Sequence, residues 1–209
     1  MPSLIIIYGP TRAGKSYLIK WLLKSYMHRW SYGMVICPNN DPAEYDYVPQ
    51  EYVHRDGTDD AVWALRKLQE GLIATSDKPH DYQSFLVLDD CAGIMRFDSR
   101  QWVSLFVSAR HLRMTIIVSI QYAAKLSMVA RLNADYAFIF PQQGESAYRL
   151  LYEAYGGEKW RSWKEFQLWI SSHCVDHRAA LYTRAKKMTD FEWATVRAPP
   201  DLGRFRLAW

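Results

Sequence analysis

The sequence predicts an α/β fold, because short apolar segments alternate along the chain with segments of helical periodicity. Residues 3–8 form a continuous apolar run that ends at Gly9, which is typical of a strand buried on both faces of a parallel sheet. From Lys15 to about Arg29, large apolar residues recur at the spacing of one helix face. Strands and helices in alternation imply right-handed crossovers and a mainly parallel sheet with helices on both faces.

The same alternation continues through most of the chain. Beyond Gln143 the pattern changes to two helices and a last strand. The expected strands lie at residues 33–37, 85–89, 115–120, 136–140 and 179–182, and the expected helices at residues 60–74, 98–112 (capped by Asp98), 123–132, 146–155 and 159–171.

Composition excludes several classes of protein. The 209 residues are 49% hydrophobic and 23% charged with a formal net charge of +4, which excludes disordered, collagen-like and coiled-coil chains. No apolar run approaches the roughly 20 residues of a membrane span, so no transmembrane segment is expected. Cys37, Cys91 and Cys174 are odd in number and widely spaced, as expected of reduced thiols inside a cell.

The segment between the first strand and the first helix fits the P-loop pattern G-x-x-x-x-G-K-[ST] at every fixed position. Its glycines let the backbone wrap closely around phosphate oxygens, and the following helix directs its positive end at the same anion. Lys15 would contact the β- and γ-phosphates of a nucleotide, and the Ser16 hydroxyl would bind Mg²⁺. The predicted nucleotide-binding residues are Gly9, Pro10, Thr11, Arg12, Ala13, Gly14, Lys15, Ser16 and Tyr17.

Two further strands end in polar residues suited to phosphate chemistry. The strand at 85–89 ends in Asp89 and Asp90, the arrangement of a Walker B motif. Asp89 would hold the metal through its water shell, and Asp90 would orient or deprotonate the attacking water. The strand at 115–120 is followed by Gln121, which would position that water if the strand lies between the other two. The alternative for Gln121 is a structural bond to nearby backbone.

These motifs, taken together with Ser108–Gln121, resemble the FtsK-HerA superfamily of DNA-pumping ATPases. The pair Arg110-His111 before a strand ending in glutamine, and Asn133-Ala134-Asp135-Tyr136 before the next strand, resemble its poxvirus-type genome-packaging branch. Cys37-Pro38-Asn39-Asn40 adds a looser match. The sequence departs from many relatives in having Asp90 in place of glutamate.

The resemblance implies a P-loop NTPase with an additional strand in its sheet, as in RecA and FtsK. It also implies a Mg²⁺-dependent ATPase that translocates double-stranded DNA without sequence preference. The expected partners are identical subunits in a hexameric or pentameric ring and a capsid protein. The expected location is the host cytoplasm or the packaging vertex of a virion.

Arg110 is expected at the edge of the sheet opposite to the P-loop. The strand that separates it from Gln121 spans about 25 Å, so Arg110 cannot reach its own nucleotide. The resemblance implies that it acts as an arginine finger in the site of a neighbouring subunit, with Arg113 as the substitute. The alternative is a cation that stabilises a helix C-terminus.

Other interpretations remain open. A small P-loop kinase would transfer phosphate to a small molecule as a monomer, and a capsid or scaffold component would bind ATP without using its hydrolysis. A GTPase is disfavoured because the chain has no Asn-Lys-x-Asp motif. A zinc site at His173, Cys174 and His177 is disfavoured because a second ligand pair at suitable spacing is missing.

The chain is expected to divide into an ATPase domain at residues 1–183 and a basic, aromatic tail at residues 184–209. The tail either packs on the surface of its own chain or docks on a neighbour. The acidic, tyrosine-rich loop at residues 39–60 is expected to be solvated, with an interaction surface as the alternative.

Overall fold

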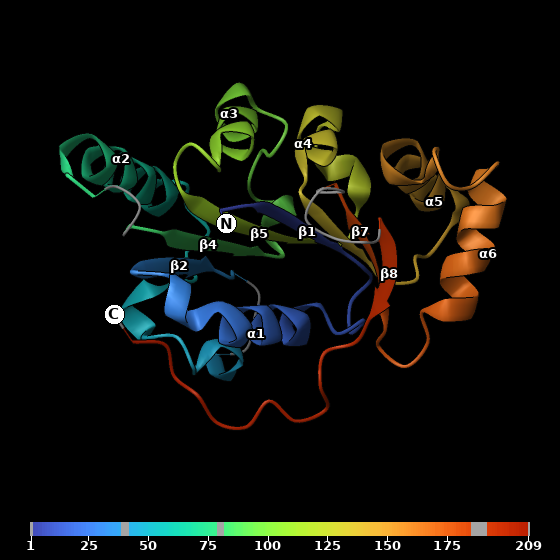
Figure 1. Ribbon diagram of the computed structural model, residues 1–209, viewed down its shortest axis with the longest axis horizontal. Helices are drawn as coiled ribbons and strands as arrows, with labels where there is room; N and C mark the ends of the chain where they lie inside the picture. Colours follow the sequence, from blue (N-terminus) through green and yellow to red (C-terminus); the bar gives the residue numbers. More distant parts are fainter. Residues whose placement is uncertain (1, 39–41, 79–81, 185–191, 209) are drawn as a thin grey trace.

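The computed structural model describes residues 2–38, 42–78, 82–184 and 192–208, which form one sheet with helices on both faces (Figure 1). The helices are α1 (Lys15–Tyr26), α2 (Asp60–Thr75), α3 (Arg100–Ser108), α4 (Met128–Asn133), α5 (Glu145–Leu151) and α6 (Trp163–His173). The strands are β1 (Leu4–Tyr8), β2 (Tyr32–Ile36), β3 (Val53–His54), β4 (Ser84–Asp89), β5 (Met114–Ile120), β6 (Tyr136–Ile139), β7 (Ala179–Thr183) and β8 (Trp193–Val196).

The sheet has the strand order β3-β2-β4-β5-β1-β6-β7-β8. Strands β1 to β6 pair in parallel, whereas β7 and β8 are antiparallel to their neighbours. The prediction of a mainly parallel P-loop sheet is therefore confirmed. β5 lies between β1 and β4, so the carboxyl ends of these three strands meet at one edge of the sheet.

The two faces of the sheet carry separate hydrophobic cores. Successive side chains of a strand point to opposite faces, so Leu4 and Ile6 of β1 belong to the core beneath α2, α3 and α4, while Ile5 and Ile7 pack with α1. Figure 1 shows α1 below the sheet and α2, α3 and α4 above it. This burial on both faces explains why β1 is apolar throughout.

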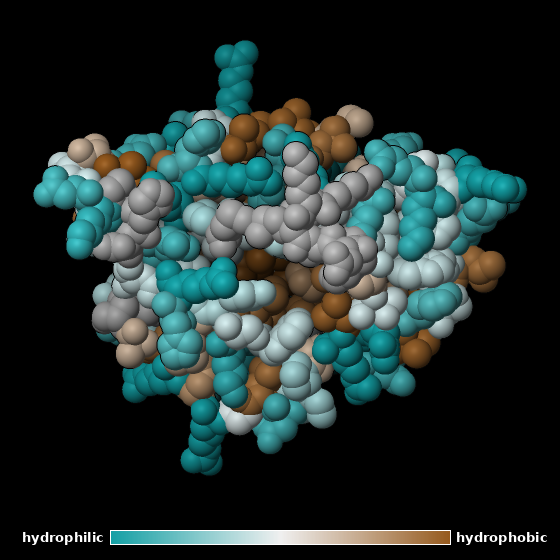
Figure 2. All heavy atoms as spheres, viewed as in Figure 1, coloured by the Kyte–Doolittle hydropathy of each residue, from teal (hydrophilic) through white to brown (hydrophobic). Residues whose placement is uncertain are grey.

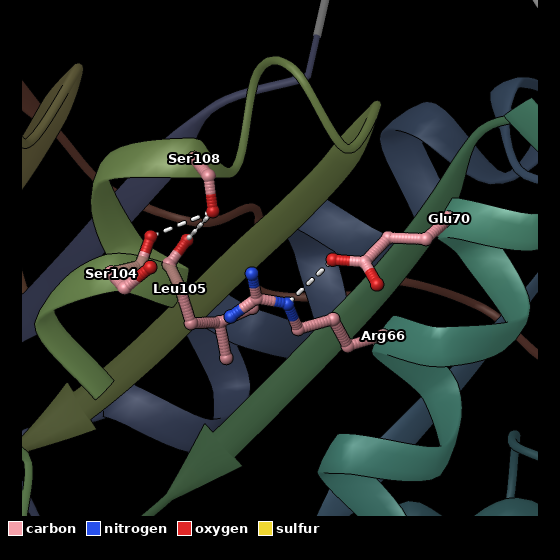
Figure 3. Close-up of polar contacts among 5 residues, drawn as sticks. All are labelled: Arg66, Glu70, Ser104, Leu105 and Ser108. Carbon is pink, nitrogen blue, oxygen red and sulfur yellow. Dashed lines mark hydrogen bonds and ion pairs between the residues drawn. The ribbon is translucent and has the colours of Figure 1, made fainter. Parts of the chain in front are cut away.

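Helix α3 is shorter than the sequence pattern indicates. It begins after Ser99 rather than Asp98, because the Ser99 hydroxyl accepts a hydrogen bond from the backbone N–H of Trp102 (3.5 Å). At its other end the Ser108 hydroxyl donates to the carbonyl oxygens of Ser104 (2.7 Å) and Leu105 (3.3 Å), as Figure 3 shows. The chain then turns through residues 109–113 into β5.

The surface of neighbouring α2 carries an ion pair one helical turn apart. Arg66 Nε donates to Glu70 at 2.8 Å, also drawn in Figure 3. A partly exposed pair of this kind contributes a few tenths of a kcal/mol, about 0.3–0.5 kcal/mol.

The helix expected at residues 123–132 is two pieces. Residues 123–125 form one turn of 3-10 helix, and α4 begins at Met128 after its cap, Ser127. The Ser127 hydroxyl accepts a hydrogen bond from the backbone N–H of Ala130 at 3.2 Å, which fixes the start of α4.

The C-terminal part of the chain folds onto the domain. β8 pairs with β7, and residues 197–208 then run along the outside of α1 (Figure 1). Tyr17 Oη donates to the carbonyl oxygen of Pro199 (2.9 Å), and Leu207 N donates to that of Tyr47 (2.8 Å). Packing on its own chain is thus the outcome for the described part of the tail. The division into a domain at residues 1–183 and a tail at residues 184–209 remains a prediction. β8 belongs to the expected tail in sequence but pairs with β7 of the sheet.

The acidic loop is only partly solvated over its described part, residues 42–60, since Asp46, Glu51 and Asp56 are exposed. Tyr45 and Tyr47 are 0% and 3% exposed and belong to the core beside α1. The expectation of a solvated loop was wrong for these two tyrosines, because their rings pack against α1 and the C-terminal segment. No periodic pattern in the sequence indicates that packing. Residues 39–41 lie outside the described residues.

Figure 2 shows a hollow with hydrophobic residues inside it, between α1 and the sheet. It corresponds to a cavity of about 300 Å³ lined by Ile5 and Ile117 of the sheet and by Trp21 of α1. Over the parts of the chain that the structure describes, no helix combines the length and the hydrophobicity needed to cross a bilayer.

Candidate active site

The turn between β1 and α1 has the geometry of a phosphate-binding loop. Gly14, directly before α1, has a φ of 102°, a conformation that residues with a Cβ rarely adopt. Arg12 is also left-handed, with a φ of 65°. The Ala13 N–H donates to the carbonyl oxygen of Pro10 (3.3 Å), which closes the turn. The free N–H groups of such a turn, together with the first turn of α1, form an anion site.

Lys15 lies inside this turn and is 8% exposed. Its Nζ donates to the carbonyl oxygen of Pro10 (2.9 Å). Burial lowers the pKa of Lys15 from its ordinary value, while the nearby carboxylates of Asp89 and Asp90 oppose that change. The ammonium group is therefore held where a bound anion would strengthen its charged form.

Asp89, the last residue of β4, is buried and receives two side-chain hydrogen bonds on one oxygen. Ser16 Oγ donates to Asp89 Oδ2 at 3.0 Å, and Tyr45 Oη donates to the same atom at 2.8 Å. The P-loop serine and the Walker B acid are thus in direct contact, as expected of two groups that serve one metal ion.

Asp90 and Gln121 form a second pair. Gln121 Nε2 lies 2.9 Å from both carboxylate oxygens of Asp90, and Thr11 Oγ1 donates to Gln121 Oε1 at 3.2 Å. Asp90 has a left-handed backbone with a φ of 56°, which aspartate tolerates better than most residues. This backbone turns the second acid toward β5 and away from the strand axis. The ends of β1, β4 and β5 are linked by hydrogen bonds.

These groups line a cavity of about 370 Å³ at the carboxyl edge of the sheet. The cations Lys15 and Arg12 and the acids Glu44, Asp89 and Asp90 all face it. Three carboxylates and two cations leave a formal excess of one negative charge, so a polyphosphate needs an added cation there.

The oxygen donors present fit magnesium. Ser16 supplies a hydroxyl and Asp89 a carboxylate, and Mg²⁺ takes few protein ligands when phosphates and water complete its shell. Among the described residues, no group of three or more His, Cys, Asp or Glu side chains could hold a metal by itself. Ser16 and Asp89 are the side chains that would hold a magnesium ion bound to phosphate.

Arg110 lies at the opposite edge of the sheet. It forms an ion pair with Asp135, which is 4% exposed and also accepts a hydrogen bond from the backbone N–H of Leu4 (2.9 Å) at the start of β1. The Arg110 side chain is 61% exposed. The sequence predicts that Arg110 is far from its own P-loop, and its position at this edge agrees with that prediction. Its role in a neighbouring site remains a prediction, and Asp135 gives it a structural role as well.

The same edge carries further cations. A depression there is lined by Arg29, Arg110 and Arg113 and by His28 and His111. Arg113, the substitute arginine finger, therefore lies on the same surface as Arg110.

Sequence reasoning missed three residues around the cavity. Tyr45 contacts Asp89, Glu44 faces the cavity, and the Ala13 carbonyl oxygen accepts a hydrogen bond from His177 Nδ1 (3.1 Å). From the sequence, Tyr45 was only one of the tyrosines that follow Cys37-Pro38, and no role in the site was assigned to it. His177 was considered only as a zinc ligand together with Cys174, and that site was disfavoured. No sequence signal connected His177 with the P-loop.

A family model described as Poxvirus A32 protein matches residues 1–147, which contain all three strand ends of the site. The chain belongs to the poxvirus A32 protein family. Viral proteins without a characterised function are among its relatives. Protein 075L of invertebrate iridescent virus 6 is 27% identical over 196 residues, which cover 91% of this chain and 74% of that protein. Protein L437 of Acanthamoeba polyphaga mimivirus is 26% identical over 168 residues. These cover 75% of this chain and 58% of L437, so the A32-family chain spans less than two thirds of that relative.

Solved structures share the fold. The genome packaging NTPase B204 of Sulfolobus turreted icosahedral virus 2, in complex with AMPPCP, has a TM-score of 0.64 at 16% identity over 95% of this chain and 98% of B204. The cytoplasmic domain of the type VII secretion ATPase EccC of Thermomonospora curvata has a TM-score of 0.63 at 13% identity over 94% of this chain and 25% of EccC. The fold of this A32-family chain is therefore that of P-loop ATPases, and the expected fold class is confirmed.

Proposed function

We propose that this chain is an ATPase that couples hydrolysis of Mg-ATP to movement of double-stranded DNA and that it packages a viral genome. One observation carries the enzymatic part of the proposal. The ends of β1, β4 and β5 bring a P-loop, a buried acid and a Gln-Asp pair around one cavity. A kinase needs water excluded, whereas the Gln121–Asp90 pair offers groups that can position it.

The relatives support the biological part. The chain belongs to the poxvirus A32 family, and B204 is named as a genome packaging NTPase and a DNA-packaging ATPase. Motors that step along any sequence must contact mainly phosphates, so we propose sequence-independent binding of duplex DNA. By the same analogy, a capsid protein is the proposed partner. The packaging vertex of a virion or the host cytoplasm is the proposed location of this chain.

In the proposed ground state, the backbone N–H groups of the P-loop and Lys15 bind the β- and γ-phosphates. Lys15 Nζ exchanges the carbonyl oxygen of Pro10, now 2.9 Å away, for a phosphate oxygen. Ser16 and Asp89 would hold a magnesium ion, which when bound would neutralise part of the charge of the phosphates.

In the proposed hydrolytic step, water attacks the γ-phosphorus as the bond from that phosphorus to the bridging oxygen breaks. Asp90 accepts the proton of the water, and Gln121 orients the water through its amide. ADP and inorganic phosphate are the products. Thr11 donates a hydrogen bond to Gln121 at 3.2 Å, which connects the P-loop with the residue proposed to position the water.

We further propose that each site in a ring is completed by Arg110 of the adjacent subunit. Its side chain is 61% exposed at the edge remote from its own P-loop, beside four other basic side chains. In trans, it would neutralise charge that develops in the transition state.

The first experiment measures ATP turnover with and without long duplex DNA, together with the mass of the assembled particle. Wild type is expected to assemble and to be stimulated by DNA. Lys15→Ala should abolish nucleotide binding, while Asp90→Asn should bind ATP and lose hydrolysis. DNA-indifferent turnover by a monomer would instead favour a kinase or a nucleotide-stabilised scaffold, and wild-type turnover in Asp90→Asn would remove the assigned role of Asp90.

The second experiment mixes two inactive variants. Arg110→Ala rings and Lys15→Ala rings are each expected to be inactive, whereas mixed rings regain part of the activity, because some interfaces combine an intact P-loop with an intact arginine. A purely structural role of Arg110 in pairing with Asp135 gives no rescue. Absence of rescue in rings of confirmed mixed composition therefore contradicts a shared site, and Arg113→Ala tested in the same way identifies the substitute.

A further inference from the structure

A second cavity adjoins the phosphate cavity on the side away from Asp90. Its volume is about 320 Å³, and it shares Gly14 and Tyr17 with the first. Its remaining walls come from Phe140 after β6, from His177 before β7 and from residues 196–200 after β8. The two cavities meet at the start of α1.

The orientation of a bound triphosphate follows from the phosphate cavity. Its terminal phosphate belongs near Gln121 and Asp90, because those residues lie at the ends of β5 and β4. The chain of phosphates then passes Lys15 and Ser16 toward Tyr17. The nucleoside part must therefore leave the first cavity at Tyr17, where the second cavity begins.

The second cavity suits a flat apolar ring. Leu18, Phe140, Val196, Ala198 and Pro200 supply most of its described surface. Among the described residues that line it, the polar side chains belong to Tyr17, His177 and Arg197. A nucleobase can be held in such a pocket by stacking and shape, with a few polar groups left for the ribose.

Hydrogen bonds connect the walls of this cavity with the P-loop and the start of α1. His177 Nδ1 donates to the carbonyl oxygen of Ala13 (3.1 Å), and Tyr17 Oη donates to that of Pro199 (2.9 Å). Asp176 and His177 both have left-handed backbone, with φ of 52° and 59°, so the turn before β7 is bent toward the loop. Strain of this kind is often found where a chain approaches a ligand.

We propose that this cavity binds the base and ribose of the nucleotide, and that residues 196–200 of the C-terminal segment form part of the ATP site. The inference rests on the proposed function, since it assumes that the P-loop binds a nucleotide. It assigns a nucleotide-binding role to a segment beyond residues 1–147, which are the residues matched by the family model.

Calorimetry with two ligands tests the proposal. Mg-ATP reports on both cavities, whereas Mg-tripolyphosphate reports on the phosphate cavity alone. Ala198→Phe places a ring in the second cavity, and Ala208→Phe makes the same change at an exposed position of the same segment. We expect Ala198→Phe to weaken the binding of ATP by about tenfold or more, roughly 1.4 kcal/mol, and to leave the affinity for tripolyphosphate unchanged. Ala208→Phe should match wild type for both ligands.

Several outcomes overturn the proposal. Wild-type affinity of Ala198→Phe for ATP would do so, as would an equal loss of tripolyphosphate binding, which would assign the effect to the phosphate cavity. A wild-type protein that binds tripolyphosphate as tightly as ATP would show that no nucleoside pocket contributes. Failure of nucleotide binding, on which the proposed function depends, is different, because wild type would then bind neither ligand.

A measurement on wild-type protein avoids any effect of substitution on folding. Irradiation with 8-azido-ATP should attach label to Tyr17, to His177 or to residues 196–200, as located by peptide mass spectrometry. Excess ATP should suppress the label. Specific label confined to other parts of the chain contradicts the assignment.

Discussion

Replacing Tyr45 with phenylalanine removes one hydroxyl and tests how the Walker B acid is held. Tyr45 Oη donates to Asp89 Oδ2 at 2.8 Å, and both residues are almost fully buried. Burial, followed by the charge of Asp89, raises the pKa of Tyr45 well above its ordinary value, so the hydroxyl stays protonated and remains a donor. The bond is therefore present at every pH at which the protein would be assayed.

The magnitude follows from the charge of the acceptor. A hydrogen bond to a charged group contributes about 1.5–3 kcal/mol to stability. Because Ser16 still donates to the same oxygen in the variant, we expect a loss near the lower end, about 1.5–2 kcal/mol. For a protein of this size that corresponds to a fall in melting temperature of roughly 3–8 °C. The carboxylate would also be less well oriented, so we expect the Mg²⁺ concentration for half-maximal turnover to rise by about tenfold.

Tyr47→Phe is the matched control. Tyr47 lies two residues further on, is 3% exposed, and its hydroxyl has no hydrogen-bond partner among the described residues. Removal of an unsatisfied buried hydroxyl should leave the melting temperature unchanged or raise it. Thermal melts and Mg²⁺ titrations of both variants separate the two cases. Equal melting temperatures and equal Mg²⁺ requirements would refute the role given to Tyr45.

Three further predictions concern the loop, a cap and the thiols. Gly14→Ala should weaken Mg-ATP binding and lower the melting temperature, because its φ of 102° penalises a Cβ by about 1–2 kcal/mol; unchanged melting and calorimetry would contradict this. Ser162→Ala should destabilise the protein by about 1 kcal/mol in urea melts, because the Ser162 hydroxyl accepts from the N–H of Glu165 (3.3 Å) at the start of α6, and Ser172→Ala is the control in the same helix. Burial raises the pKa of the Cys37 and Cys174 thiols to about 11, above the ordinary value of 9.0. The unfolded chain therefore loses these protons first, and the free energy of unfolding should fall as the pH rises from about 9 to about 11. Because burial also raises the pKa of the Cys91 thiol, the slope in Cys37→Ala/Cys174→Ala should be shallower than in wild type without disappearing, and equal slopes would contradict the prediction.

Much of the fold could be predicted from local pattern. β1, β4 and β5 are buried on both faces, so their apolar runs identified them directly, and the P-loop motif located the turn between β1 and α1. The position of β5 between β1 and β4 came from the class of protein that the motifs resemble, because no local pattern specifies strand order. Helix ends were less certain where two capping residues adjoin, as Asp98 and Ser99 do.

The contacts that join distant segments could not be predicted. Tyr45 reaches Asp89 across 44 positions of sequence, and His177 reaches Ala13 across 164. β8 has only four residues and pairs antiparallel at the end of the sheet, so neither length nor periodicity distinguished it from a tail. Such contacts depend on the assembled sheet, which brings the ends of separate strands together.

The bond between Gln121 and Asp90 has a consequence for the role proposed for Asp90. Gln121 Nε2 lies 2.9 Å from both oxygens of the acid, and each of these oxygens keeps a further lone pair. In the proposed hydrolytic step, Asp90 could therefore accept a proton from water while the same amide still fixes the orientation of its carboxylate.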